Sequence, residues 1–130
     1  MKKVAKIVLI DKDDNYLLLY RSNHPVFGND PDLPGGTLEE GESTIETVIR
    51  ETEEETGIVV KNVEELYAGL DYSVHGTHKT LFVARVGERP EVRLSWEHES
   101  FAWLPREEFL LKAKGANDSY MHMVYEVLSS

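Results

Sequence analysis

The 130-residue sequence contains no cysteine. A chain without thiols cannot form disulfides, use a cysteine nucleophile or hold zinc through cysteine ligands. Long hydrophobic runs are also missing, because no apolar stretch approaches the ~20 residues that a membrane-spanning helix needs. Lys6 interrupts the short apolar stretch near the basic start, and no small-residue cleavage site follows, so we expect no signal peptide. These absences favour a cytoplasmic protein without a membrane partner.

Basic residues are scarce, with 14 Lys and Arg against 24 Asp and Glu and a formal net charge of −10. The sequence has no basic stripe that could displace counterions, so we expect no stable nucleic-acid partner. Eight of the acidic residues lie between Glu39 and Glu55, where Arg50 is the single base. An anionic phosphate substrate would be repelled from this segment unless bound cations offset its charge.

The residues that are present describe an ordinary globular domain. Hydrophobic residues make up 41% of the chain and charged residues 29%. A chain of this length buries about two-thirds of its unfolded surface. No repeat, low-complexity segment or linker divides residues 1–130, so we predict a single domain, as a monomer or a homodimer.

Apolar runs and turn residues predict the order of the elements. Predicted strands occupy residues 4–10, 16–20, 58–63, 65–72 and 80–86. Predicted helices follow Ser43 and begin at Pro105 and Ser119, with loops at residues 21–34 and 112–118. Because the connections resemble hairpins, the expected fold class is α/β (α+β), with a mixed sheet packed between helices.

The helix after Ser43 has a start and a stop in the sequence. Ser43 and Glu46 form a capping box, which satisfies backbone N–H groups of the first turn. Gly57 follows the last periodic residue, where a left-handed glycine closes a helix at little steric cost. The spacing i, i+3, i+4, i+7 assigns a core face to Ile45, Val48, Ile49 and Thr52.

The opposite face of this helix carries clustered carboxylates. Glu51, Glu54 and Glu55 are spaced i, i+3 and i+4, so they repel one another from a single patch. They also lie in the C-terminal half, where the helix dipole prefers cations, and Arg50 offers the only local relief. Such a face is often plain solvated surface. Clustered carboxylates are also the usual ligands of hard divalent cations.

The surrounding residues complete a longer pattern, G-x5-E-x7-R-E-U-x-E-E-x-G-U, where U is a bulky aliphatic residue. It runs through Gly36, Glu42, Arg50, Glu51, Thr52, Glu54, Glu55, Gly57 and Ile58. This segment resembles the signature of the Nudix hydrolases, of the MutT-like type. Thr52 departs from the pattern at an aliphatic position, which we interpret as a small packing loss.

The resemblance implies an α/β/α sandwich and hydrolysis of a nucleoside diphosphate linked to another group. It implies Mg²⁺ as cofactor, with Mn²⁺ as a possible substitute. By matched position, the metal ligands are Glu51, Glu54, Glu55 and the backbone carbonyl of Gly36. Arg50 would orient the glutamates, and Glu42 would support either the metal shell or the loop.

The general base is left open between two positions. Glu54 is the favoured base within the motif. Glu97, in a Glu-His segment that resembles the late strand of many Nudix domains, is the alternative and could instead complete the metal shell. Glu99 is held in reserve for the same role. A solvent-facing glutamate before a strand is the plain interpretation of Glu97.

The nucleotide substrate is not specified by the sequence. The compact length resembles the enzymes that convert a nucleoside triphosphate, in some cases oxidised, to monophosphate and pyrophosphate. Hydrolysis of ADP-ribose, nucleotide sugars or dinucleoside polyphosphates is the alternative, and a catalytically silent nucleotide-binding module is another. Arg21 could bind a substrate phosphate or form a surface salt bridge. Pro31 stands where related enzymes often carry a tryptophan, so a base-stacking role at that position is in doubt.

Three other features have plainer interpretations. Residues 11–15 begin like a calcium-binding EF-hand loop but lack the required glycine and final glutamate, so we predict a turn. His75 and His78 lack partner ligands and are predicted to lie in a turn. Trp96 and Trp103 are predicted to be core aromatics.

Overall fold

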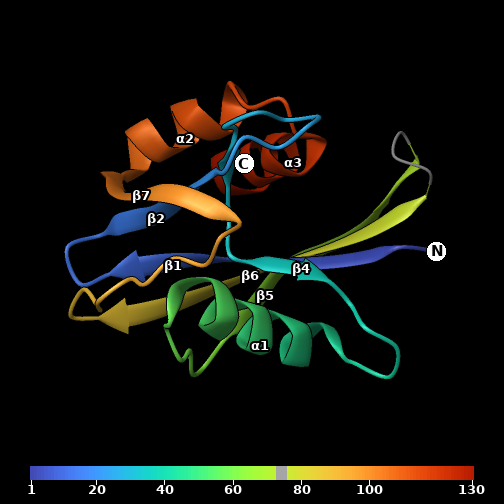
Figure 1. Ribbon diagram of the computed structural model, residues 1–130, viewed down its shortest axis with the longest axis horizontal. Helices are drawn as coiled ribbons and strands as arrows, with labels where there is room; N and C mark the ends of the chain where they lie inside the picture. Colours follow the sequence, from blue (N-terminus) through green and yellow to red (C-terminus); the bar gives the residue numbers. More distant parts are fainter. Residues whose placement is uncertain (73–75) are drawn as a thin grey trace.

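Figure 1 shows the computed structural model, which describes residues 1–72 and 76–130. The strands are β1 (Lys3–Asp11), β2 (Asn15–Arg21), β3 (Pro31–Asp32), β4 (Gly35–Thr37), β5 (Glu64–Asp71), β6 (Thr77–Gly87) and β7 (His98–Pro105). The helices are α1 (Thr44–Thr56), α2 (Arg106–Lys114) and α3 (Ser119–Ser129). None of the helices in this described part of the chain has the length and apolar character that crossing a bilayer requires.

The described strands form a mixed sheet in the order β3-β2-β1-β6-β5, with β4 paired to β1 and β7 paired to β2. β1 and β6 are parallel, and the other pairs are antiparallel. Helix α1 covers one face of the sheet, and α2 and α3 cover the other (Figure 1). The predicted mixed sheet between helices is therefore confirmed.

The central strand β1 is buried on both faces, which explains its continuous apolar sequence. Because side chains alternate along a strand, Ile7 and Leu9 pack on the α1 side. Val8 and Ile10 pack on the α2 and α3 side, with Phe109. Two cores thus share one strand, and β1 holds both layers together.

The edge of β1 opposite β6 is divided between two partners. Its first half pairs with β4, with Ala5 opposite Gly36 and Lys6 opposite Gly35. Its second half pairs with β2, with Ile10 opposite Tyr16. Between these partners, the Ile7 amide donates to the carbonyl of Pro34 at 3.0 Å. The same edge of β1 therefore pairs with β2 and with β4, and β4 contains Gly36 of the signature segment.

Helix α1 has the predicted start and stop, with a complete capping box at Ser43 and Gly57 at a φ of 77°. Val48 and Thr52 are buried as predicted. The prediction that Ile45 faces the core is wrong, because Ile45 is 46% exposed. The buried stripe also includes Thr47 and Glu55, so it is rotated toward Glu55 and leaves Ile45 at its margin.

Other local predictions are also wrong. Residues 58–63 form no strand, because the segment is an irregular connection between α1 and β5, in which Ile58 and Val60 are buried and Val59 is exposed. Helix α2 runs to Lys114, so the predicted loop from residue 112 begins later. His78 lies in β6 and not in a turn, whereas His75 lies outside the described residues.

The two tryptophans also differ from the expectation. Trp103 packs against the α1-side core, as predicted. Trp96 is 87% exposed, so its assignment to the core is wrong. The turn that places the neighbouring Glu97 at the lining of a pocket leaves Trp96 in solvent. The turn after β1 forms as predicted, and the Asp11 carboxylate accepts the Asn15 amide at 2.9 Å.

Gly35 is required where β4 meets β1. Its φ is +137°, and a Cβ there would lie 2.5 Å from the Lys6 Cα and collide with the Ala5 carbonyl. Because backbone atoms cannot yield cheaply, Gly35→Ala should lower the free energy of unfolding by about 2–4 kcal/mol, measured by urea denaturation. Gly41→Ala is the control, since Gly41 also has a positive φ but open space around it. Equal losses in the two variants would contradict this account.

Candidate active site

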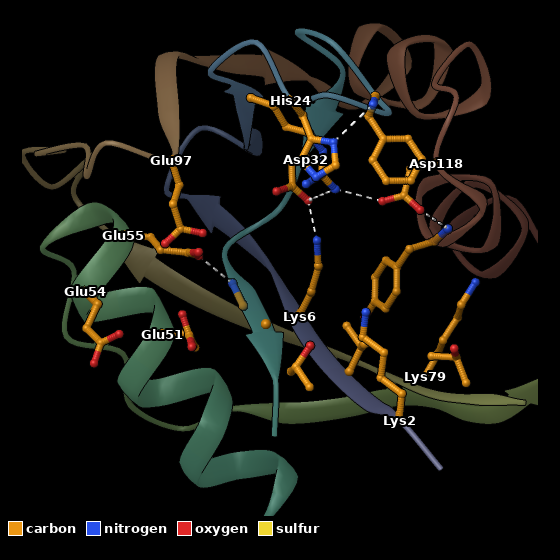
Figure 2. Close-up of a pocket in the computed structure, with 18 of the residues that line it drawn as sticks. Lys2, Lys6, His24, Asp32, Glu51, Glu54, Glu55, Lys79, Glu97 and Asp118 are labelled. Atoms are coloured by element: carbon orange, nitrogen blue, oxygen red, sulfur yellow. Dashed lines mark hydrogen bonds and ion pairs between the residues drawn. The ribbon is translucent and has the colours of Figure 1, made fainter. Parts of the chain in front are cut away.

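Three carboxylates from two distant segments meet beside the sheet. Glu51 and Glu55 come from α1, and Glu97 comes from the turn before β7. One carboxylate oxygen from each lies within 4.8 Å of the others. Figure 2 shows Glu97 and Glu55 facing the same space above Glu51. We call Glu51, Glu55 and Glu97 the carboxylate cluster.

Backbone hydrogen bonds hold the segment that carries Glu97 against its neighbours. The Ser95 amide donates to the carbonyl of Glu55 at 3.2 Å, at the end of α1. The Ser22 amide, just after β2, donates to the carbonyl of Glu97 at 2.9 Å. Glu97 is therefore fixed between α1 and β2 by the backbone, independently of its own side chain.

Glu55 is the deepest member of the cluster, at 3% exposed. Its Oε1 accepts the Gly35 amide at 2.9 Å. Burial raises the pKa of Glu55 to about 9, and the negative charges of Asp32 and Glu97 add to the shift. Burial also raises the pKa of Glu51. A hard cation would favour the ionised form of both groups, so this oxygen donor set fits Mg²⁺.

The Arg50 guanidinium donates hydrogen bonds to three carboxylates of the motif. Its Nε donates to Glu42 at 2.6 Å, and its Nη1 donates to Glu51 at 3.1 Å and to Glu54 at 3.2 Å. The hydrogen bond from Arg50 lowers the pKa of Glu42 to about 2. Glu42 also accepts the Thr47 hydroxyl at 2.8 Å, so it braces the loop and the helix start.

The remaining predicted residues are distributed around the cluster. Glu54 lines the same pocket, but its side chain is 58% exposed and it is not one of the three clustered carboxylates. Gly36 lies against Glu51, because a Cβ on Gly36 would stand 3.1 Å from the Glu51 Cδ. Glu99 accepts a hydrogen bond from Asn29 and is absent from the described lining of the pocket.

A buried ionic network adjoins the cluster, and sequence reasoning missed most of it. Asp32 accepts hydrogen bonds from Lys6 at 2.5 Å and lies 2.9 Å from the His98 Nε2. Arg21 pairs with Asp118 at 2.8 Å and with Asp32 at 3.3 Å. Although burial opposes it, Lys6, His98 and Arg21 hold the pKa of Asp32 well below its usual range.

Arg21 therefore does not form a surface salt bridge, since its side chain is only 15% exposed. The sequence contained one signal of this network. Lys6 interrupts an otherwise apolar strand, and a charge inside a buried strand needs a partner. The partner, Asp32, is far away in sequence, so the pairing could not be read from the local pattern.

The carboxylate cluster and four members of the network line one pocket of about 550 Å³; these four are Lys6, Arg21, Asp32 and Asp118. Figure 2 shows the carboxylate cluster and Glu54 on one side, with Lys2, Lys6 and Lys79 across from them. In the described lining, seven Asp and Glu side chains stand against five Lys and Arg side chains. Lysines thus lie across the pocket from the carboxylate cluster, although Asp32 and Asp71 offset part of the charge of Lys6 and Lys79. An anion needs bound cations beside the cluster.

Comparisons with known proteins show which family this chain resembles. The family model described as NUDIX domain matches residues 1–124. The chain is 38% identical over 110 residues to the asymmetrical bis(5'-nucleosyl)-tetraphosphatase of Sus scrofa, covering 77% of this chain and 73% of that protein. It is 41% identical over 75 residues to the ADP-ribose pyrophosphatase of Methanocaldococcus jannaschii, covering 56% of this chain and 44% of that protein.

The structure resembles the crystal structure of a MutT protein from Bacillus halodurans, with a TM-score of 0.75 and 29% identity over 100% of this chain and 84% of the other. Several curated relatives are matched over only 44% to 55% of their length, so the chain spans about half of those proteins. The match to the family model covers nearly the whole chain, including every residue of the carboxylate cluster. This chain belongs to the Nudix family.

Proposed function

We propose that this protein hydrolyses a phosphoanhydride bond of a nucleoside polyphosphate with the help of a divalent cation. The observation that carries the proposal is the cluster of Glu51, Glu55 and Glu97, whose oxygens lie within 4.8 Å of one another in a pocket with a basic opposite side. Hydrolysis of a phosphoanhydride needs countercharge and an aligned water more than it needs covalent chemistry. The pocket provides places for both.

The cluster residues would hold Mg²⁺, which supplies charge neutralisation and makes a bound water more acidic. Arg50 positions Glu51 and Glu54 through the hydrogen bonds of its Nη1. The Glu54 side chain is more exposed to solvent than that of Glu51, and Glu54 takes the proton from the attacking water. Glu97 is the alternative base, although its place in the cluster favours a role as metal ligand.

The basic side of the pocket favours a substrate with three or more phosphates. Lys2, Lys6 and Lys79 line the wall across from the cluster, so a phosphate chain held at the metal can reach additional positive charge. Lys6 and Lys79 already pair with Asp32 and Asp71, which holds their ammonium groups in place. We therefore propose nucleoside triphosphates, cleaved to monophosphate and pyrophosphate.

A dinucleoside tetraphosphate is the second candidate. It satisfies the same charge argument, and the similarity to the pig tetraphosphatase extends over 77% of this chain. ADP-ribose has only two phosphates and would make fewer contacts with Lys2, Lys6 and Lys79. The cofactor proposal is Mg²⁺, with Mn²⁺ as substitute, and the partner is a small nucleotide.

A product-release screen tests the proposal. The purified protein is incubated with Mg²⁺ or Mn²⁺ and either nucleoside triphosphates, including those with oxidised bases, or dinucleoside tetraphosphates, ADP-ribose and nucleotide sugars. We expect turnover that EDTA abolishes, on compounds with three or more phosphates. Turnover confined to ADP-ribose or nucleotide sugars would reject the substrate proposal and keep the chemistry. Absence of turnover on the whole panel, with either metal, would reject the enzyme and favour a nucleotide-binding module.

A further inference from the structure

A short hairpin beside the pocket, residues 22–29, carries two aromatic rings. The amides of His24 and Gly28 each donate to the other's carbonyl at 2.8 Å, and Gly28 adopts a φ of 61°. The His24 Nδ1 accepts the amides of Val26 at 3.0 Å and Phe27 at 3.2 Å. These bonds fix the turn, and they orient the His24 ring with Nδ1 toward the backbone of the hairpin.

The hairpin places both rings at the pocket. His24 and Phe27 line it, and their ring centroids are 5.1 Å apart with an interplanar angle of 34°. Figure 2 shows His24 at the rim, across the pocket from Glu51 and Glu54. The third aromatic residue of the described lining, Tyr120, is only 3% exposed, and the rest of that lining consists largely of charged and small residues. Phe27 is half-buried, so an apolar ring borders a charged pocket without being part of either core.

The ring of Phe27 is supported by a charged side chain. The Arg21 guanidinium carbon lies 5.1 Å from its centroid. Arg21 is itself held by Asp118 and Asp32 in the buried network. The Asn29 side chain also donates to the carbonyl of Arg21 at 2.9 Å. The aromatic pair is therefore anchored to the same network that borders the carboxylate cluster.

We propose that His24 and Phe27 form the surface on which the nucleobase of the substrate stacks. This inference rests on the proposed function, because it assigns the other end of the same substrate. Every nucleobase has a flat face, so stacking on an aromatic ring tolerates different bases. His24 adds a second ring nitrogen, Nε2, which the hydrogen bonds within the hairpin do not use and which could bond to the edge of the base.

The test compares the binding of a nucleotide with the binding of a phosphate chain that has no nucleobase. Calorimetric titration in the presence of Mg²⁺ measures the affinity of the wild type, Phe27→Ala and Phe27→Trp for ATP and for inorganic tripolyphosphate, which has no base. ATP is supplied as its α,β-methylene analogue, because the proposed reaction cannot cleave that bridge. We expect Phe27→Ala to weaken ATP binding by about tenfold or more and tripolyphosphate binding hardly at all. Phe27→Trp should restore ATP binding. Val26→Ala, an exposed position in the same hairpin, is the control and should bind both as the wild type does.

The outcomes distinguish this inference from the proposed function. Equal weakening of both ligands in Phe27→Ala would overturn the stacking surface and indicate an indirect effect through Arg21. Unchanged ATP binding, or a wild type that binds ATP no more tightly than tripolyphosphate, would also overturn it, while leaving metal-dependent hydrolysis intact. A protein without turnover that still prefers ATP through Phe27 would support the stacking surface and reject the proposed function.

Discussion

Replacing Glu55 with glutamine should abolish metal-dependent turnover and, at the same time, make the metal-free protein more stable. Burial raises the pKa of Glu55 from 4.5 to about 9 in the folded protein. Between these values the unfolded chain has released the proton while the folded chain retains it, so stability falls as the pH rises through this window. Glutamine removes that titration, and its amide oxygen can still accept the Gly35 amide.

The expected gain for metal-free Glu55→Gln at pH 7 is about 1–3 kcal/mol, and it should shrink toward pH 5. Urea denaturation in EDTA at pH 5, 7 and 8.5 measures it. Added Mg²⁺ should stabilise the wild type and not the variant, because binding to the folded state alone raises stability. Glu53→Gln, an exposed position on the same helix, is the control. A metal-free Glu55→Gln protein that is less stable than the wild type at pH 8.5 would refute this explanation.

The second large effect distinguishes the general base from the metal ligands. Glu54→Gln should lower kcat by about 10²–10⁴ while the Mg²⁺ concentration for half-maximal activity stays unchanged, because Glu54 lies outside the three clustered carboxylates. Glu97→Gln should instead raise that Mg²⁺ concentration by about tenfold or more, since it removes the negative charge of a cluster carboxylate.

Steady-state kinetics over a Mg²⁺ titration measures both values for each variant. The comparison has a built-in control, because each substitution removes one charge from the same pocket. A loss of kcat in Glu97→Gln at saturating Mg²⁺, together with a normal kcat in Glu54→Gln, would reverse the two assignments. Near-normal kinetics in both variants would remove these glutamates from the mechanism.

The signature helix could be predicted because its information is local. The capping box, the apolar spacing and Gly57 all lie within one segment, and α1 forms with these limits. The rotation of its buried stripe could not be predicted, because it depends on the bond between Glu55 and the Gly35 amide. The exposure of Ile45 follows from that tertiary contact.

The residues of the site could be predicted only at the positions that the family pattern includes. The pattern named Glu51 and Glu55, and the resemblance drew attention to Glu97. It gave no hint of the network around Asp32, because Lys6 and His98 are separated from it by 26 and 66 positions. Such pairings depend on which strands become neighbours. The exposed Trp96 has the same origin, since a turn set by Ser22 and Glu55 decides which way the neighbouring side chains face.

The divided edge of β1 bears on how this protein could acquire a new substrate. One partner of this edge, β4, is followed by α1, which carries Glu51 and Glu55. The other partner, β2, is followed by the hairpin that we assign to the nucleobase. Both partners pair with one strand, so changes in residues 23–28 that keep the hydrogen bond between Ser22 and Glu97 need not displace the carboxylate cluster. Evolution, or an engineer, could therefore vary residues 23–28 and alter nucleotide choice while the carboxylate cluster is kept.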